Sequence, residues 1–142
     1  MIGILVVTHG ALAAELTRAA SEIAGETEAI AAVGLDWNEA GESARDRIQA
    51  AIAAVDRGKG VLILTDMFGG TPSNLAFPFL QENEVEIVTG ANLPMLLRSL
   101  ATRKEESLAA LAHAVRERGR KSIEVASELL AQASRTGDPR AS

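Results

Sequence analysis

The stretch Gly60-Val-Leu-Ile-Leu-Thr-Asp-Met-Phe-Gly-Gly-Thr-Pro-Ser-Asn74 decides the fold of this chain. Its first six residues, 60–65, form a continuous apolar run, which is typical of a strand buried on both faces of a sheet. Asp66 ends the run and two glycines follow. Thr71 and Pro72 are then favoured residue types for the N-cap and first position of a helix. A buried strand that passes through a glycine turn into a helix indicates part of a parallel βαβ unit.

The same alternation of strand and helix patterns extends outward over the chain. Strands are indicated by short apolar runs, and helices by apolar side chains that recur every three to four residues. The predicted strands are residues 2–7, 29–35, 60–65 and 85–89, and the predicted helices are residues 11–24, 39–55, 72–81 (kinked or shortened at Pro78), 94–102 and 106–118. This order predicts an α/β fold with a doubly wound, mainly parallel sheet and helices on both faces.

The C-terminal part of the chain has a less decisive pattern. Residues 121–126 have a period that permits a helix, but Ile123 and Val125 alternate as in a short edge strand. The polar residues 134–142 include a glycine and a proline and are expected to fray, which places the folded domain at residues 1–133.

Composition restricts the classes of function. The chain has 142 residues, of which 47% are hydrophobic and 23% charged, and this is typical of a globular domain. A net charge of −5 without a basic cluster argues against nucleic-acid binding. The absence of cysteine excludes disulfides and thiolate ligands. No apolar run has the length of a membrane span, and the N-terminal residues lack the pattern of a signal peptide. A cytoplasmic location is therefore expected.

Polar residues follow three of the predicted strands, in the segments 8–10, 66–74 and 90–94. Ligands of open parallel sheets bind at the carboxyl ends of the strands. If the first and third strands are neighbours, His9 and Asp66 face each other across this edge.

Histidine and aspartate in this arrangement suit nucleophilic chemistry. A carboxylate on one imidazole nitrogen fixes the tautomer and leaves the lone pair of the other nitrogen free to attack. The turn formed by Gly69, Gly70, Thr71 and Ser73 offers backbone N–H groups and hydroxyls at a helix start, which favours a phosphoryl group. No metal and no diffusible cofactor is expected, because there is no carboxylate–histidine cluster, Walker A motif or dinucleotide fingerprint.

Each of these features also has a purely structural interpretation. His9 alone could be a turn residue, Asp66 a capping or turn aspartate, and the glycine segment a tight turn before a capped helix. His113 lies within a helical stretch and is expected to be structural or solvated. Trp37, the sole tryptophan, is either a packing residue or an exposed contact. The coincidence of the first three features at strand ends favours a functional site.

Three segments together resemble a known family. The opening Gly-Ile-Leu-Val-Val-Thr-His9-Gly-Ala-Leu-Ala is similar to the start of the IIA domain of the mannose family of the bacterial phosphotransferase system. Leu64-Thr-Asp66-Met-Phe-Gly-Gly-Thr-Pro-Ser-Asn74 and Gly90-Ala-Asn92-Leu-Pro94-Met-Leu resemble its second and third motifs. The similarity covers about residues 1–130, and three ordered motifs are far more specific than one.

The resemblance implies a function and a set of site residues. His9 would accept phosphate from the phosphocarrier protein HPr and pass it to a histidine of a IIB component, which serves membrane IIC and IID components. Asp66 would orient the imidazole, and Gly69, Gly70, Thr71 and Ser73 would bind phosphate. The partner surface implied by the motifs consists of Gly10, Met67, Phe68, Asn92 and Pro94.

The resemblance also implies a homodimer, in which a short antiparallel strand near residues 121–126 is exchanged between subunits. Many relatives carry a fused IIB domain behind an Ala/Pro-rich linker, and neither is found in residues 1–142. We therefore expect either a separate IIB chain or a regulatory phosphohistidine module. Dihydroxyacetone-kinase relatives fit less well, because they carry His-Ser where this chain has His9-Gly10. A metal-free phosphatase or small-molecule-binding domain of the same fold is the third alternative.

Overall fold

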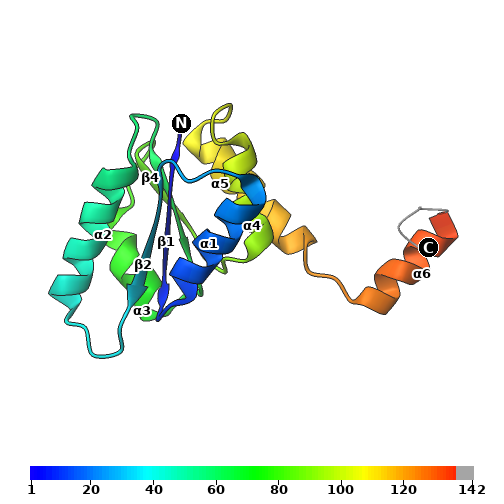
Figure 1. Cartoon of the computed structure of the whole chain (residues 1–142), viewed down its shortest axis with the longest axis horizontal. Coiled ribbons are helices and arrows are strands. Elements are labelled where there is room, and N and C mark those ends of the chain that lie inside the picture. Colours follow the sequence, from blue (N-terminus) through cyan, green and yellow to red (C-terminus); the bar gives the residue numbers. More distant parts are fainter. Residues whose placement is uncertain (137–142) are drawn as a thin grey trace.

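The computed structural model describes residues 1–136 and contains a four-stranded parallel sheet with helices on both faces (Figure 1). The helix predicted over 72–81 ends early, because Pro78 lies in a 3₁₀ turn. The four parallel strands and the other predicted helices are found with small shifts at their ends, and the final helix, residues 126–136, was not predicted. The elements are β1 (Gly3–His9), α1 (Leu12–Ala24), β2 (Ile30–Leu35), α2 (Gly41–Val55), β3 (Val61–Thr65), α3 (Thr71–Ala76), η1 (Phe77–Phe79), β4 (Val85–Val88), α4 (Leu93–Thr102), α5 (Leu108–Lys121) and α6 (Ala126–Thr136).

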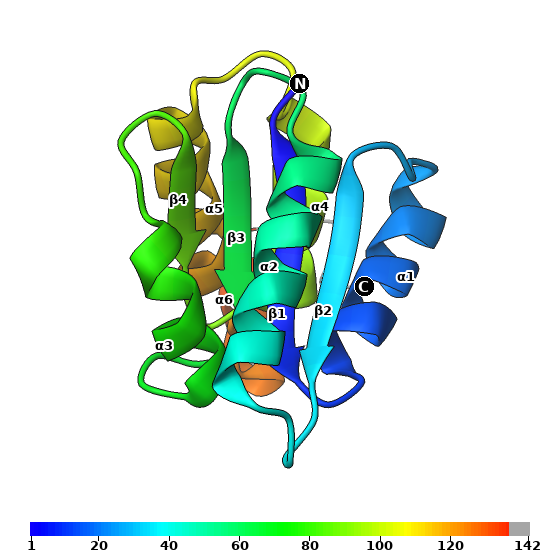
Figure 2. The same cartoon turned by 90° about the vertical axis from the view of Figure 1, so that its left-hand side faces the viewer.

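The strand order is β2-β1-β3-β4, so β1 and β3 are neighbours. All three pairings are parallel, with Leu5 of β1 opposite Ala31 of β2 and Ile63 of β3. Figure 2 shows the four strands pointing the same way. The chain runs from β1 outward to β2 and then crosses back to β3, so its direction of winding reverses between β1 and β3. The crevice beyond the carboxyl ends of these two strands is the expected binding position in such a sheet.

Two hydrophobic layers hold the sheet in place. Alternate side chains of a strand point to opposite faces, and every residue from Ile4 to Val7 is fully buried. Ile4 and Val6 pack with α1, α4 and α5, whereas Leu5 and Val7 pack with α2 and α3. Figures 1 and 2 show these helices on the two faces. Burying one aliphatic side chain completely stabilises the folded chain by about 1.5–3 kcal/mol. A strand that is buried on both faces, such as β1, is therefore almost wholly apolar.

A buried arginine joins elements at the amino edge of the sheet. Arg103, which follows α4, is 1% exposed. Its guanidinium donates to the carbonyl oxygens of Ala29 (3.2 Å) and Glu28 (2.8 Å) and to Glu26 Oε2 (3.1 Å). Its own carbonyl oxygen accepts the N–H of Ile2 at 3.3 Å. Arg103 therefore ties the α1–β2 connection to the start of β1.

The antiparallel strand predicted near residues 121–126 is not found within residues 1–136. Lys121 is the last residue of α5, and Ser122 continues the helical turn by donating from its N–H to Gly119 O at 3.3 Å and from Oγ to Arg118 O at 2.6 Å. An edge strand requires a neighbouring ladder, whereas this segment leads away from β4 to α6, which stands off from the sheet (Figure 1). Of the tail predicted to fray, residues 134–136 belong to α6 and 137–142 lie outside the described residues.

Candidate functional site

His9 and Asp66 are in direct contact at the carboxyl edge of the sheet. His9 is the last residue of β1 and Asp66 follows β3, so the pairing of these strands brings together two residues 57 positions apart. Asp66 Oδ2 lies 2.7 Å from His9 Nδ1 and also accepts the backbone N–H of His9 at 3.0 Å. Asp66 Oδ1 accepts the N–H of Met67 at 3.0 Å. The carboxylate thus has partners on both oxygens.

These contacts determine the charge of Asp66 and the tautomer of His9. Burial acts to raise the pKa of Asp66. Other contacts outweigh burial and lower this pKa below its usual value: the hydrogen bonds from the His9 backbone and imidazole, the charge of the imidazole and the N–H of Met67. An ionised carboxylate only accepts hydrogen bonds, so Nδ1 carries the proton. In the neutral ring Nε2 then holds the lone pair. Within residues 1–136, no group donates a hydrogen bond to Nε2.

Thr8 fixes the backbone around His9, a role that the sequence patterns did not reveal. Its side chain is fully buried, and its hydroxyl donates to His9 O at 3.1 Å while accepting the N–H of Ala13 at 2.7 Å. The first turn of α1 has no side-chain cap from its own N-cap residue, so Thr8 satisfies one of its free N–H groups. The end of β1 and the start of α1 are therefore joined beside His9.

Glycine is required where β2 passes the His9 turn. A Cβ on Gly34 would overlap the carbonyl oxygen of Gly10. Gly10 itself has a left-handed φ of +53°. The N–H of Gly10 donates to Leu35 O at 2.9 Å, and Leu35 is the register partner of His9. Gly10 therefore turns the chain tightly beside the imidazole.

The predicted phosphate-binding turn reaches the imidazole. Gly69 has a φ of +83°, and Gly70 is the N-cap of α3, one residue before the predicted Thr71. A Cβ on Gly70 would lie 3.0 Å from His9 Cε1 and 3.7 Å from Nε2. Thr71 is exposed at the helix start. Ser73 is fully buried and its hydroxyl donates to Gly70 O at 2.9 Å, so this hydroxyl shapes the turn.

Apolar side chains surround the His9 site on the solvent side. Met67 and Phe68, predicted to contact a partner, are 54% and 74% exposed. Trp37, in the loop between β2 and α2, is 86% exposed, and the centroid of its ring lies 5.5 Å from that of His9. The structure thus resolves the two interpretations of Trp37 in favour of an exposed residue, and places it at the site.

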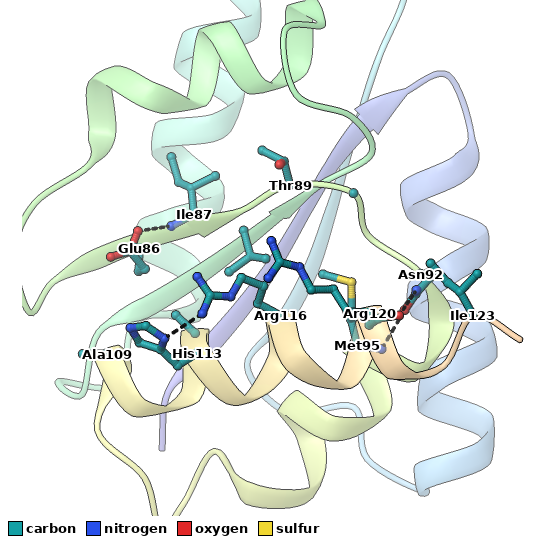
Figure 3. A pocket seen from close by; sticks show the side chains of 14 residues that line it. Glu86, Ile87, Thr89, Asn92, Met95, Ala109, His113, Arg116, Arg120 and Ile123 are labelled. Atoms are coloured by element: carbon teal, nitrogen blue, oxygen red, sulfur yellow. Dashed lines mark hydrogen bonds between the residues drawn. The ribbon is translucent and has the colours of Figure 1, made fainter.

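Asn92 and Pro94 take part in the start of α4. Asn92 is its N-cap and accepts the N–H of Met95 at 3.1 Å, while its amide donates to Gly119 O at 3.3 Å, and Pro94 lies in the first turn. Asn92 also lines a cavity of about 570 Å³ between β4 and α5 (Figure 3). His113 lies there, exposed and 3.2 Å from Arg116, so of its two predicted roles, structural or solvated, the exposed position favours the second. Neither His9 nor Asp66 lines this cavity.

Two further features are not found in the described part of the chain. Among residues 1–136, no group of three or more histidine, aspartate or glutamate side chains is arranged to hold a metal ion. Within the same range, no helix combines the length and apolar character needed to cross a membrane.

Comparison with known proteins identifies the family. The EIIA-man family model, described as the PTS system fructose IIA component, matches residues 3–116. The chain belongs to the EIIA-man family. The fructose-specific EIIA component of Bacillus subtilis (strain 168) is 30% identical over 131 residues, which cover 92% of this chain and 90% of that protein.

Other members of the family agree in sequence and in structure. The mannose-specific EIIAB component of Escherichia coli (strain K12) is 34% identical over 106 residues, or 74% of this chain, and the match spans only 33% of that longer protein. The crystal structure of phosphotransferase system component EIIA from Streptococcus agalactiae matches with a TM-score of 0.81 and 25% identity, over 90% of this chain and 99% of the other.

Proposed function

We propose that this EIIA-man member is a protein-to-protein phosphotransferase that carries a phosphoryl group on His9 Nε2. The observation that carries the proposal is the 2.7 Å contact between His9 Nδ1 and Asp66 Oδ2, which leaves Nε2 as the available nucleophile. In the proposed reaction phospho-HPr is the donor and a IIB component is the acceptor. The IIB component acts with the membrane IIC and IID components of a sugar transporter. The reaction requires no metal or cofactor of this chain, since donor and acceptor are both proteins.

The transfer step exchanges one P–N bond for another. The lone pair of His9 Nε2 attacks phosphorus, and the bond from phosphorus to the donor imidazole breaks. The electron pair of that bond returns to the donor ring, which leaves neutral because its other nitrogen carries a proton. The His9 ring becomes cationic while Nδ1 keeps its proton, and the ionised Asp66 stabilises this charge. Transfer to IIB is the same step in reverse.

The glycine turn supports the phosphoryl oxygens in this proposal. Gly69, Gly70 and Thr71 precede or begin a helix, where backbone N–H groups lack intrahelical acceptors and favour an anion. The approach of Gly70 to the Nε2 edge of the ring supports this placement. Thr71 offers an exposed hydroxyl, and Ser73 positions the turn through Gly70 O. Positioning and charge stabilisation account for most of the catalysis of phosphoryl transfer.

The partner surface in the proposal comprises the residues that flank the site. Gly10, Met67 and Phe68 adjoin His9 and Asp66 in the chain, and Met67 and Phe68 are exposed apolar residues of the kind enriched at interfaces. Asn92 and Pro94, which begin α4, complete the proposed surface. These contacts would place the protein in the cytoplasm, reaching the inner membrane only through its transporter partners.

A homodimer is also part of the proposal. Ile123 and Val125 are exposed between α5 and α6, and β4 is an outer strand of the described sheet, with β3 as its neighbour. A second copy that covers this region would remove apolar surface from water. Light scattering of the full chain tests this, and Ile123→Glu is expected to shift a dimer toward monomer.

The experiment that tests the phosphoryl carrier is labelling by phospho-HPr. We expect an acid-labile, base-stable phosphate on the wild-type chain and on His113→Ala, which removes the only other histidine. His9→Ala should abolish the label, and full labelling of this variant would overturn the proposal. Addition of a IIB component then separates a relay, which loses its phosphate, from a regulatory module, which keeps it.

A further inference from the structure

Trp37 is the only tryptophan of the chain, and its side chain is exposed to solvent beside His9. It is 86% exposed, its ring centroid lies 5.5 Å from that of His9, and the two ring planes are tilted by 33°. Within the described residues, its ring–ring contact is with His9. Burying a large aromatic ring is favourable, so an indole left exposed at this position is not explained by stability of the fold.

The loop that carries Trp37 is fixed by a cluster around Glu39. The Glu39 carboxylate accepts Arg47 at 2.7 Å and the hydroxyl of Ser43 at 3.0 Å. Arg47 also donates to Gly34 O at 3.0 Å, so the cluster joins β2 to α2 across the loop. Burial acts to raise the pKa of Glu39, but Ser43, the Asp36 N–H and Arg47 outweigh it and lower this pKa. Glu39 therefore remains ionised and keeps the loop in place.

Asp66 alone does not determine the orientation of the His9 ring. One hydrogen bond at Nδ1 fixes that atom but allows the rest of the ring to tilt around it. Gly70 lies beside the Cε1 edge, where an added Cβ would come to 3.0 Å from Cε1, and the Trp37 indole lies against the ring with the geometry of a tilted aromatic pair. These contacts together determine the direction in which Nε2 points.

We propose that Trp37 is a positioning residue, which holds the imidazole of His9 so that Nε2 faces the incoming phosphorus. This inference rests on the proposed phosphoryl transfer. The indole has a second effect, because the ring of His9 becomes cationic when the N–P bond forms and an aromatic face attracts a cation. A cation–π contact at an exposed site is worth about a two- to fivefold change in rate, and loss of alignment increases this factor.

Single-turnover transfer from phospho-HPr separates positioning from docking. For Trp37→Ala we expect the transfer rate at saturating donor to fall about tenfold, with little change in the donor concentration that gives half the maximal rate. Trp37→Phe should restore most of the rate, since it keeps a flat ring, and Trp37→Leu should not. The matched control is Ile23→Ala, which removes an exposed apolar side chain of α1 outside the site. It should leave both the maximal rate and the half-saturating concentration near wild type.

A measurement that needs no transfer tests the same contact. The ring current of Trp37 should shift the NMR signals of the His9 ring protons, and Trp37→Ala should remove this shift while Arg47→Met, which breaks the Glu39 cluster, reduces it. Comparison with His9→Ala and His113→Ala assigns the signals. An unchanged His9 spectrum and an unchanged maximal rate in Trp37→Ala would overturn the inference. If the wild-type chain is not labelled by phospho-HPr, the proposed function fails, and the NMR shifts still decide whether Trp37 positions His9.

Discussion

The polar side chains at the two edges of the sheet have opposite surroundings. At the amino edge, Arg103 is 1% exposed and its guanidinium donates to two carbonyl oxygens and the carboxylate of Glu26. At the carboxyl edge, His9 has a side chain that is 29% exposed, and only one of its ring nitrogens has a partner within residues 1–136. A buried guanidinium that makes three hydrogen bonds holds elements together, although its Nε has no partner among the described residues, whereas a partly exposed ring with one unpaired nitrogen remains able to react.

The turns at the two edges make different contacts, although glycines with positive φ occur at both edges. The carboxyl edge contains three glycines with positive φ, Gly10, Gly69 and Gly90, each directly after a strand or in the turn that follows it. These glycines allow tight turns that bring backbone N–H groups close to the site. Glycines with positive φ (Gly25, Gly58 and Gly60) also lie at the amino edge, but there Ile2, Glu28 and Ala29 are joined to Arg103 through hydrogen bonds. We therefore expect variants at the two edges to affect different quantities, stability at one and transfer at the other.

The largest effect is expected from Arg103→Ala. Removing the guanidinium takes away the Arg103 donors to Glu28 O and Glu26, leaves Ala29 O with the N–H of Ile4 alone, and leaves a cavity where a buried side chain stood; we expect a cost of about 2–5 kcal/mol. Urea unfolding measures this loss, and the transfer rate per folded molecule should not change. Arg57→Ala is the control, because its contact with Glu28 is an exposed one at 4.0 Å, worth at most about 1 kcal/mol. Equal losses in the two variants would contradict the comparison.

Asp66→Asn should produce the opposite result. The amide cannot hold the protonated Nδ1 as a carboxylate does and does not stabilise the cationic ring, so we expect the rate of transfer from phospho-HPr to fall about a hundredfold. The shape of Asn is close to that of Asp, so the urea midpoint at pH 7 should change far less than for Arg103→Ala. A variant that transfers phosphate at the wild-type rate would show that the contact with Asp66 only anchors the backbone.

Gly70→Ala tests the close approach of the turn to the ring. The new Cβ would lie 3.0 Å from His9 Cε1 and 3.1 Å from Met67 Cγ, so the imidazole must move by a few tenths of an ångström. We expect about a tenfold lower transfer rate, which is less than the hundredfold loss that accompanies a displacement of about 1 Å. Gly41→Ala is the matched control, because its Cβ meets nothing within 4 Å at the start of α2. If both substitutions are silent, the turn does not constrain the ring.

The smallest effect is expected from acid titration of Asp66. Its pKa is lowered in the folded chain, so it binds protons more weakly there than in the unfolded chain, where the value is about 3.9. The stabilisation is complete above the unfolded pKa and is lost as the pH falls through the lower folded pKa. The free energy of unfolding of the wild type should therefore fall more steeply than that of Asp66→Asn below about pH 4. Parallel curves would refute this linkage.

Local sequence patterns were sufficient for most of the fold. The apolar runs at 2–7 and 60–65 predicted buried strands, and the structure confirms both because each side chain from Ile4 to Val7 and from Val61 to Leu64 packs against a helix layer. The strand predicted at 121–126 is not seen within residues 1–136, because alternation of Ile123 and Val125 supplies apolar side chains but no neighbouring strand for a ladder.

By itself, the sequence determined the chemistry that is available to this protein: a histidine and an aspartate after two apolar strands, a glycine turn before a helix, and no cysteine. The tertiary structure decided which atoms meet. The parallel pairing of β1 and β3 placed Asp66 Oδ2 2.7 Å from Nδ1 of His9, the β2–α2 loop placed Trp37 against the same ring, and Arg103 found its partners more than 70 residues away. Such contacts join residues that are distant along the chain, and their directions follow from strand order and packing, which no local pattern encodes.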